Sequence, residues 1–234
     1  MSAESTKSGK VALIRKRAEL LHRARAFFDE RGLIEVDVPL LVQGAPLDAH
    51  IDLFEVLTQK GHRYLHSSPE HGMKRLLAAG CPDCYQMSHV FRLGEQSSRH
   101  NPEFLMAEWY RRGWSLEQLM EETVALFRLF LGPCEVRYSG YWDLLTAQVG
   151  ADLSQATTAD LLMICKQKNI ELGSSASTWD RTALIQLLFA TTVEPTLGQE
   201  TLDLVIDWPE DQAAHSRKIL RDGRWVAQRF EAYY

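Results

Sequence analysis

Apolar residues recur at two different spacings along this chain, and the spacing predicts where helices and strands lie. Residues 10–31 carry apolar side chains three and four positions apart, which predicts an amphipathic helix ending at Gly32. Residues 33–38, 85–92 and 103–110 alternate apolar and polar side chains, which predicts strands. The polar segment 93–102 joins the last two strands, so we expect a hairpin there.

Capping residues predict two further helices. Ser68-Pro69 favours a helix start, because serine is a good N-cap and proline suits the first helical position. That helix is expected to end at Gly80. Ser115 and Gln118 have the spacing of a capping box, which predicts a helix to about residue 131.

The second half of the chain changes character. Residues 134–195 read as short helices at 141–149, 158–168 and 179–191, which we interpret as a helical insert between parts of a sheet. Strands are expected at 51–57, 63–66, 201–207 and 224–233. Strands joined by hairpins, with helices in separate runs, predict an α+β fold in which helices flank an antiparallel sheet.

Composition narrows the class of protein. The 234 residues suffice for one large domain, which we take as residues 1–234 including the insert. No segment approaches the ~18 consecutive apolar residues of a membrane span, and residues 1–10 do not resemble a secretory signal. We therefore expect a cytoplasmic protein. The net charge of −5 argues mildly against a large tRNA-binding surface.

Four cysteines raise the question of a metal site. Cys81 and Cys84 have half of a zinc-site spacing, but neither a second cysteine pair nor a close histidine pair completes it. We therefore predict no metal held by these residues and regard the cysteines as reduced and structural.

The predicted hairpin carries the residue types needed to activate a carboxylate with ATP. Attack on the α-phosphate builds charge on phosphoryl oxygens, and Arg92 at a strand end offers a bidentate cation. Phe104 could stack on a purine, while Glu70, Glu108 and Tyr110 could hold an ammonium group. An arginine at a strand end is more often a surface residue, and Phe104 is more often core. Glu108 is harder to explain that way, because a carboxylate on an apolar face needs a partner.

Several strings in this region resemble one family. They are Ser68-Pro69-Glu70, Arg92-Leu93-Gly94-Glu95, His100-Asn101-Pro102-Glu103-Phe104, Glu108-Trp109-Tyr110-Arg111 and Arg229-Phe230-Glu231-Ala232-Tyr233-Tyr234. The hairpin resembles motif 2 of class II aminoacyl-tRNA synthetases. The sequence of this hairpin is most similar to that of the short lysyl-tRNA synthetase paralogs that modify elongation factor P.

The resemblance implies roles for single residues. Arg92 would be the catalytic residue at the α-phosphate, His100 would meet the outer phosphates, and Phe104 the adenine. Gly94, Glu95 and Asn101 would frame ATP. The amino acid would be held by the Ser-Pro-Glu string and by the returning strand, at Ser68, Pro69, Glu70, Glu108 and Tyr110.

The resemblance also implies an activity. The chain would activate a lysine-like amino acid with ATP and transfer it to a lysine of elongation factor P, as a homodimer formed through residues 10–39. About ten residues precede the first helix, so an anticodon-binding domain is not expected. Two alternatives stay open: transfer to tRNA, and a paralog that binds an amino acid or nucleotide without chemistry. The choice between α- and β-lysine is also open.

The family's motif 3 has no counterpart before Tyr234. In that family, motif 3 supplies a second ATP-contacting arginine, and the Mg²⁺ ligands lie in the same part. We therefore expect the chain to be a shortened product, a fragment or one part of a split enzyme, with the Mg²⁺ ligands in the missing C-terminal part.

Overall fold

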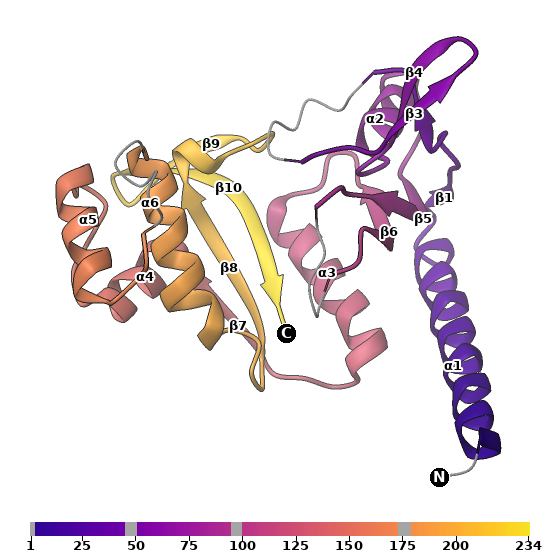
Figure 1. Cartoon of the computed structure of the whole chain (residues 1–234), viewed down its shortest axis with the longest axis horizontal. Coiled ribbons are helices and arrows are strands. Elements are labelled where there is room, and N and C mark those ends of the chain that lie inside the picture. The colour runs from indigo at the N-terminus through magenta and orange to yellow at the C-terminus, as the bar shows by residue number, and fades with distance from the viewer. Residues whose placement is uncertain (1–2, 45–50, 95–99, 173–178) are drawn as a thin grey trace. The chain divides into compact units, whose positions relative to one another are not determined.

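The computed structural model describes residues 3–44, 51–94, 100–172 and 179–234. The chain divides into two compact units, Met1–Trp114 and Ser115–Tyr234 (Figure 1). The mixture of helices with largely antiparallel sheets confirms the predicted α+β fold. No helix among the described residues is long and apolar enough to cross a membrane.

The described residues of the first unit form two helices and two small sheets. Strand β1 pairs in parallel with β5, and β5 pairs antiparallel with β6, while the antiparallel sheet β2-β4-β3 stands separately. The predicted hairpin is confirmed, and its second strand has the predicted ends. The elements are α1 (Ala3–Asp29), β1 (Ile34–Glu35), β2 (Leu41–Val42), β3 (Glu55–Thr58), β4 (Gly61–Leu65), α2 (Glu70–Ala78), β5 (Cys84–Phe91) and β6 (Glu103–Tyr110).

Helix α1 is anchored by its last turns. Phe28 is fully buried, and its ring stacks on that of Tyr85 in β5 at 4.5 Å between centroids. The Tyr85 hydroxyl donates to Asp29 at 3.0 Å and to Glu35 at 3.2 Å, so the helix end and β1 are fixed to the hairpin. Earlier in the helix, apolar side chains are exposed, including Leu13 at 71%.

The predicted strand 33–38 is shorter in the structure. Strand β1 consists of Ile34–Glu35. Further along, the backbone N–H of Val38 donates to the side chain of Gln86 in β5 at 2.8 Å rather than to a backbone carbonyl of that strand. A side-chain acceptor therefore replaces the backbone–backbone hydrogen bonds of the strand pair after β1 ends. The ideal Cβ of an alanine at position 72 would lie 2.7 Å from the Val38 Cβ, so Gly72 permits the close approach of α2.

Helix α2 begins within one residue of its predicted start. Pro69 is the N-cap, and the Ser68 hydroxyl accepts from the backbone N–H of Glu70 at 3.1 Å. Ser68 therefore lies one residue before the N-cap that the sequence predicts for it, and Pro69 one residue before the first helical position, although the Ser68 hydroxyl still satisfies a free N–H group at the helix start.

The second unit is a four-stranded sheet with helices. The strand order is β7-β8-β10-β9, with β7 parallel to β8 and the other pairs antiparallel. The three helices predicted within 134–195 are present, but that segment begins with strand β7, which the sequence analysis missed, as it missed β9. The elements are α3 (Leu116–Leu131), β7 (Val136–Gly140), α4 (Tyr141–Val149), α5 (Thr158–Gln167), α6 (Arg181–Leu188), β8 (Leu202–Pro209), β9 (Lys218–Arg221) and β10 (Arg224–Tyr233).

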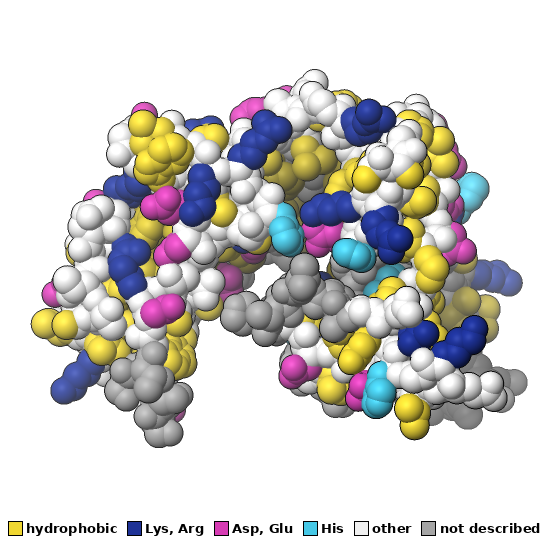
Figure 2. All heavy atoms as spheres, turned by 90° about the horizontal axis from the view of Figure 1, so that it is seen from above, with side chains coloured by type: hydrophobic (Ala, Val, Ile, Leu, Met, Phe, Trp, Pro, Cys, Tyr) yellow, Lys and Arg dark blue, Asp and Glu magenta, His cyan; other side chains and the backbone are white. Residues whose placement is uncertain are grey.

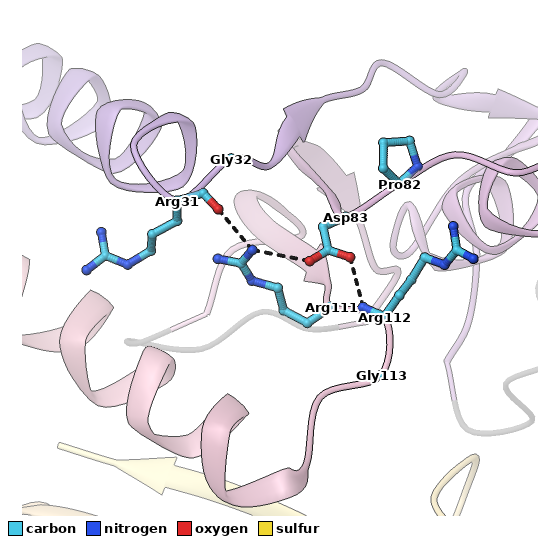
Figure 3. Close-up of a pocket in the computed structure, with 7 residues that line it drawn as sticks. All are labelled: Arg31, Gly32, Pro82, Asp83, Arg111, Arg112 and Gly113. Atoms are coloured by element: carbon cyan, nitrogen blue, oxygen red, sulfur yellow. Dashed lines mark hydrogen bonds and ion pairs between the residues drawn. The ribbon is translucent and has the colours of Figure 1, made fainter.

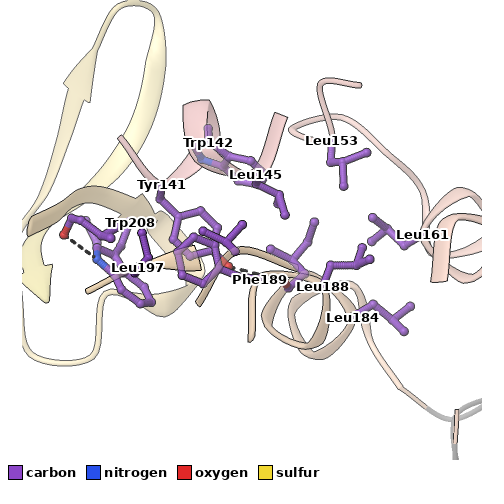
Figure 4. Close-up of a cluster of buried hydrophobic side chains, with 14 of the residues drawn as sticks. Tyr141, Trp142, Leu145, Leu153, Leu161, Leu184, Leu188, Phe189, Leu197 and Trp208 are labelled. Atoms are coloured by element: carbon purple, nitrogen blue, oxygen red, sulfur yellow. Dashed lines mark hydrogen bonds between the residues drawn. The ribbon is translucent and has the colours of Figure 1, made fainter. Parts of the chain in front are cut away.

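An aromatic cluster holds the helices of this unit on its sheet. The ring of Tyr141 stacks on that of Phe189 at 4.0 Å, and both contact Trp208 of β8 (Figure 4). Leucines from α4, α5 and α6 extend the same core. Aromatic side chains bury large areas, so this cluster is a main source of the unit's stability. The predicted capping box of Ser115 and Gln118 also forms, with bonds of 2.8 and 3.3 Å.

Surface charges of both signs are interspersed. On the face seen in Figure 2, Lys and Arg side chains lie among Asp and Glu side chains over the described residues. Such mixing matches the net charge of −5 and differs from the single basic stripe typical of proteins that bind RNA through its phosphates.

Candidate active site

One face of the β5–β6 hairpin carries a small polar group among apolar side chains. Phe104, Met106, Glu108 and Tyr110 alternate along β6 and so share a face. Residues directly opposite in an antiparallel pair lie on the same face, and Gln86 of β5 is opposite Glu108. The hairpin therefore gathers a carboxylate, a phenol and an amide on one surface.

Glu108 is the carboxylate of this face, and it is half-buried. The Tyr110 hydroxyl donates to its Oε1 at 2.7 Å, and the Ser68 hydroxyl is a second donor. Burial raises the pKa of Glu108, the charge of Glu70 raises it further, and the hydroxyl bonds and the charge of Lys74 only partly oppose this. A half-buried carboxylate with a raised pKa and a second carboxylate nearby favours binding of a cation.

The same surroundings raise the pKa of Tyr110. Burial raises the pKa of its hydroxyl, and the bond to Glu108 and the charges of Glu108 and Glu70 raise it further. The phenol therefore stays protonated and keeps donating to Glu108. The predicted group of Ser68, Glu70, Glu108 and Tyr110 is brought together by α2 and β6, with the buried Pro69 between the first two.

Glu70 lies in the first turn of α2 and forms an ion pair with Lys74, one turn later on the same helix face. The sequence analysis did not single out Lys74. The signal that could have found it is the spacing of four residues between a glutamate and a lysine, which is typical of helix-surface ion pairs.

Arg92 follows β5 and lies beside this group. Its Nε donates to the Ser67 carbonyl at 3.4 Å, and its Cζ lies 5.2 Å from the centroid of the Phe104 ring. The backbone N–H of Arg92 donates to the Pro102 carbonyl at 2.9 Å, so the hairpin itself holds the arginine. The predicted phosphate-binding and adenine-binding side chains are therefore adjacent, and Arg92 contacts the residue before Ser68.

The other residues predicted to bind ATP belong to the segment that joins β5 to β6. Gly94 is exposed at φ +86°, and His100 and Asn101 are exposed where the chain returns to β6. Glu95 lies outside the described residues. The roles of Gly94, Glu95, His100 and Asn101 toward ATP stay predictions.

Gln86 is a second residue that sequence reasoning missed. It is 2% exposed, and both ends of its amide are used: Oε1 accepts from Val38 N–H, and Nε2 donates to Ser88 Oγ at 2.9 Å. His66 is similarly buried, with Nε2 3.0 Å from the His89 carbonyl, and burial lowers the pKa of its imidazole. Both side chains join β5 to the segments that carry the site.

Two of the cavities lined by described residues lie in this unit. One of about 310 Å³ borders the site at Ser68 and is otherwise lined by Val38, Pro39, Leu41, Val42, Gln43, Gly44, His66, His71, Gly72 and Arg75. The other, of about 560 Å³, is an open depression at the base of the hairpin (Figure 3). There Asp83 accepts from the Arg111 side chain at 3.3 Å and from the Arg112 backbone at 2.9 Å. These bonds fix the end of β6 next to Tyr110.

A metal site would need several ligating side chains close together. Among the described residues, no group of three or more His, Cys, Asp or Glu side chains could hold one. Cys81 and Cys84 are free thiols, and burial raises the pKa of Cys84 to about 11, with Cys81 as a further cause. The described residues therefore do not fit a Mg²⁺ site.

Comparison with known proteins places the chain in a family. Residues 4–216 match the model of tRNA synthetases class II (D, K and N). An elongation factor P–(R)-beta-lysine ligase of Pasteurella multocida is 38% identical over 224 residues, which cover 93% of this chain and 68% of the relative. Ligases of the same name from Actinobacillus succinogenes and Vibrio vulnificus are 39% and 35% identical, covering 93% and 100% of this chain and 68% and 74% of the relatives. The chain belongs to the family of class II tRNA synthetases (D, K and N).

Proposed function

We propose that this chain activates a lysine-like amino acid with ATP and transfers it to a lysine of elongation factor P. The observation that carries the proposal is the group Ser68, Glu70, Glu108 and Tyr110, which lies next to the Arg92 guanidinium. The names of the relatives support the choice of amino acid and acceptor.

The amino acid would bind through its ammonium groups. Glu108 and Glu70 supply acceptors, and the Tyr110 hydroxyl orients the Glu108 carboxylate. A charge-assisted hydrogen bond contributes about 1.5–3 kcal/mol, so two or three of them would give a millimolar-to-micromolar site. An ammonium group would also offset the cost of ionising the half-buried Glu108.

The reaction would proceed in two steps. A carboxylate oxygen of the amino acid attacks the α-phosphorus of ATP, and pyrophosphate leaves. The acceptor lysine amine then attacks the carbonyl carbon of the adenylate, AMP leaves, and the amine loses a proton. Arg92 would stabilise charge on the α-phosphate oxygens, while Phe104 would stack on adenine.

Class II synthetases and related ligases generally use Mg²⁺ with ATP. When bound, Mg²⁺ neutralises charge on the phosphate oxygens. The Arg92 guanidinium is the cation that the described site itself supplies for that purpose.

A homodimer is the proposed assembly. In α1, Val11, Leu13 and Ile14 are 49%, 71% and 66% exposed, although the last turns of the same helix are buried. Exposed apolar side chains grouped on one helix are typical of an interaction surface. A clean monomer by light scattering would contradict this assembly.

Pyrophosphate–ATP exchange tests the proposal. The chain is expected to exchange with α-lysine or (R)-β-lysine, and Arg92→Ala is expected to lower the rate by about 10³-fold, because a cation at the reacting phosphate is lost. Arg63→Ala, on the separate sheet β2-β4-β3, is the matched control. Amino-acid binding without exchange in the folded chain would instead favour a binding protein without chemistry.

A further inference from the structure

Lys74 occupies the place where a substrate cation is expected. Its Nζ forms an ion pair with Oε1 of Glu70, and the two side chains are 45% and 38% exposed. The pair lies along the exposed surface of α2, one helical turn apart. Glu70 thus has an ammonium partner from its own chain.

The charge of the same cation also acts on the second carboxylate of the site. The charge of Lys74 lowers the pKa of Glu108, whereas burial and the charge of Glu70 raise it. Lys74 therefore lies within electrostatic range of both carboxylates. The hydroxyls of Tyr110 and Ser68 also face Glu108; they donate to it but carry no charge.

We propose that Lys74 is an internal counter-ion, which neutralises Glu70 in the empty site and is displaced by an ammonium group of the amino acid. This inference rests on the proposed function. Two ammonium groups at the same carboxylate repel each other, so Lys74 and the substrate compete for Glu70. Lys74 is thereby an affinity-determining residue rather than a catalytic one.

The structure makes displacement easy. An ion pair this exposed is screened by solvent and contributes little to stability. The lysine side chain is flexible and strongly hydrated, so it can move into water without leaving a buried charge. A substrate ammonium group that contacts both Glu70 and the half-buried Glu108 gains more interaction free energy than is lost when Lys74 leaves Glu70. A cation that reaches only Glu70 gains no such advantage, so the competition favours ligands shaped to reach both.

Exchange kinetics with four proteins test the inference. In pyrophosphate–ATP exchange with α-lysine and (R)-β-lysine, Lys74→Met is expected to lower the KM for the amino acid about two- to fivefold, because a competitor worth a surface ion pair is gone. Lys74→Arg keeps the cation and is expected to restore the higher KM. Lys60→Met, in the exposed β3–β4 turn, is the control for loss of a surface charge.

A double-mutant cycle separates competition from a structural effect. In a Glu70→Gln background Lys74 has lost the carboxylate with which it pairs, so adding Lys74→Met is expected to lower KM less than it does in the wild-type background. An unchanged or raised KM in the Lys74→Met single variant, with exchange intact, would overturn the inference and leave the proposed function standing. A folded wild-type chain that neither binds nor exchanges with either amino acid would overturn both.

Discussion

Two carboxylates, the buried Asp203 in the second unit and the half-buried Glu108 in the first, differ in how their own chain satisfies them. Asp203 of β8 accepts from Arg137 Nε and Nη2 at 2.7 and 2.9 Å, from Gly198 N–H at 2.9 Å and from the Thr201 hydroxyl at 3.0 Å. Glu108 has hydroxyl donors and a distant lysine. Asp203 accepts hydrogen bonds at both oxygens, two of them from a cation, whereas the hydrogen bonds found at Glu108 among the described residues come from uncharged hydroxyls.

The pKa values report the same difference. Burial would raise the pKa of Asp203, but the bonds from Arg137, Gly198 and Thr201 together lower it below its ordinary value. At Glu108 burial prevails, and the pKa is raised. A carboxylate satisfied by the chain stabilises the fold, whereas one that lacks a cation is suited to bind a ligand that brings one.

The largest expected effect on stability is at Asp203. Asp203→Ala is expected to lower the free energy of unfolding by about 3 kcal/mol, because Gly198 N–H and Thr201 lose their acceptor and Arg137 loses a bidentate partner. Urea denaturation measures the change. Glu210→Ala, which breaks an exposed pair with Lys218, is the control and is expected to change little. Equal losses in the two variants would contradict the distinction.

Glu108→Gln is expected to weaken amino-acid binding and to leave the stability of the fold intact. The KM for the amino acid is expected to rise about 100-fold, because the site loses a charge-assisted bond to an ammonium group. Stability at pH 7 is expected to be unchanged or slightly higher, since ionising Glu108 in the folded chain is costly. Exchange kinetics and urea denaturation give the two values, with the exposed Glu121→Gln as control. A large loss of stability with an unchanged KM would make Glu108 structural.

The pH dependence of KM follows from the raised pKa. Glu108 must be ionised to bind an ammonium group, so KM is expected to rise as pH falls through its folded pKa, beginning above the ordinary carboxyl value of 4.5. For stability, a raised folded pKa gives a contribution that is complete below the unfolded pKa and lost as pH rises through the folded one. Glu108→Gln should remove both dependences. A wild-type KM that is flat in this range would contradict the assignment.

The smallest effect is expected at Tyr110. Tyr110→Phe removes one bond to Glu108, which should raise KM about fivefold, in line with a contribution of about 1 kcal/mol. Because that bond lowers the pKa of Glu108, the pH profile of KM should also move to higher pH. Tyr138→Phe, on β7, is the matched control. An unmoved profile would show that Tyr110 does not act through Glu108.

Local patterns explain why most of the site could be predicted. Strand β6 was found from strict alternation, and Glu108 stood out because it is a charge on an otherwise apolar face. The partnership of Glu70 with Lys74 lies within one helical turn, so a search for pairs four residues apart would have found it.

What sequence reasoning missed depends on distant partners. Gln86 is buried because it bonds Val38, 48 positions away, and no local signal shows that bond. Strand β7 is short, and its parallel pairing of Val136 with Leu202 spans most of the second unit. Such elements are determined by tertiary pairing rather than by local propensity.

Discrimination among amino-acid analogues tests the central claim most directly. Pyrophosphate–ATP exchange would be measured for (R)-β-lysine, α-lysine, norleucine, which lacks the terminal ammonium group, and 6-aminohexanoate, which lacks the α-ammonium group. If the Glu70–Glu108 site recognises ammonium groups, at least one analogue should lose about 100-fold in kcat/KM, and Glu108→Gln should abolish that preference. Equal use of the lysines and both analogues by the folded wild-type chain would contradict the account.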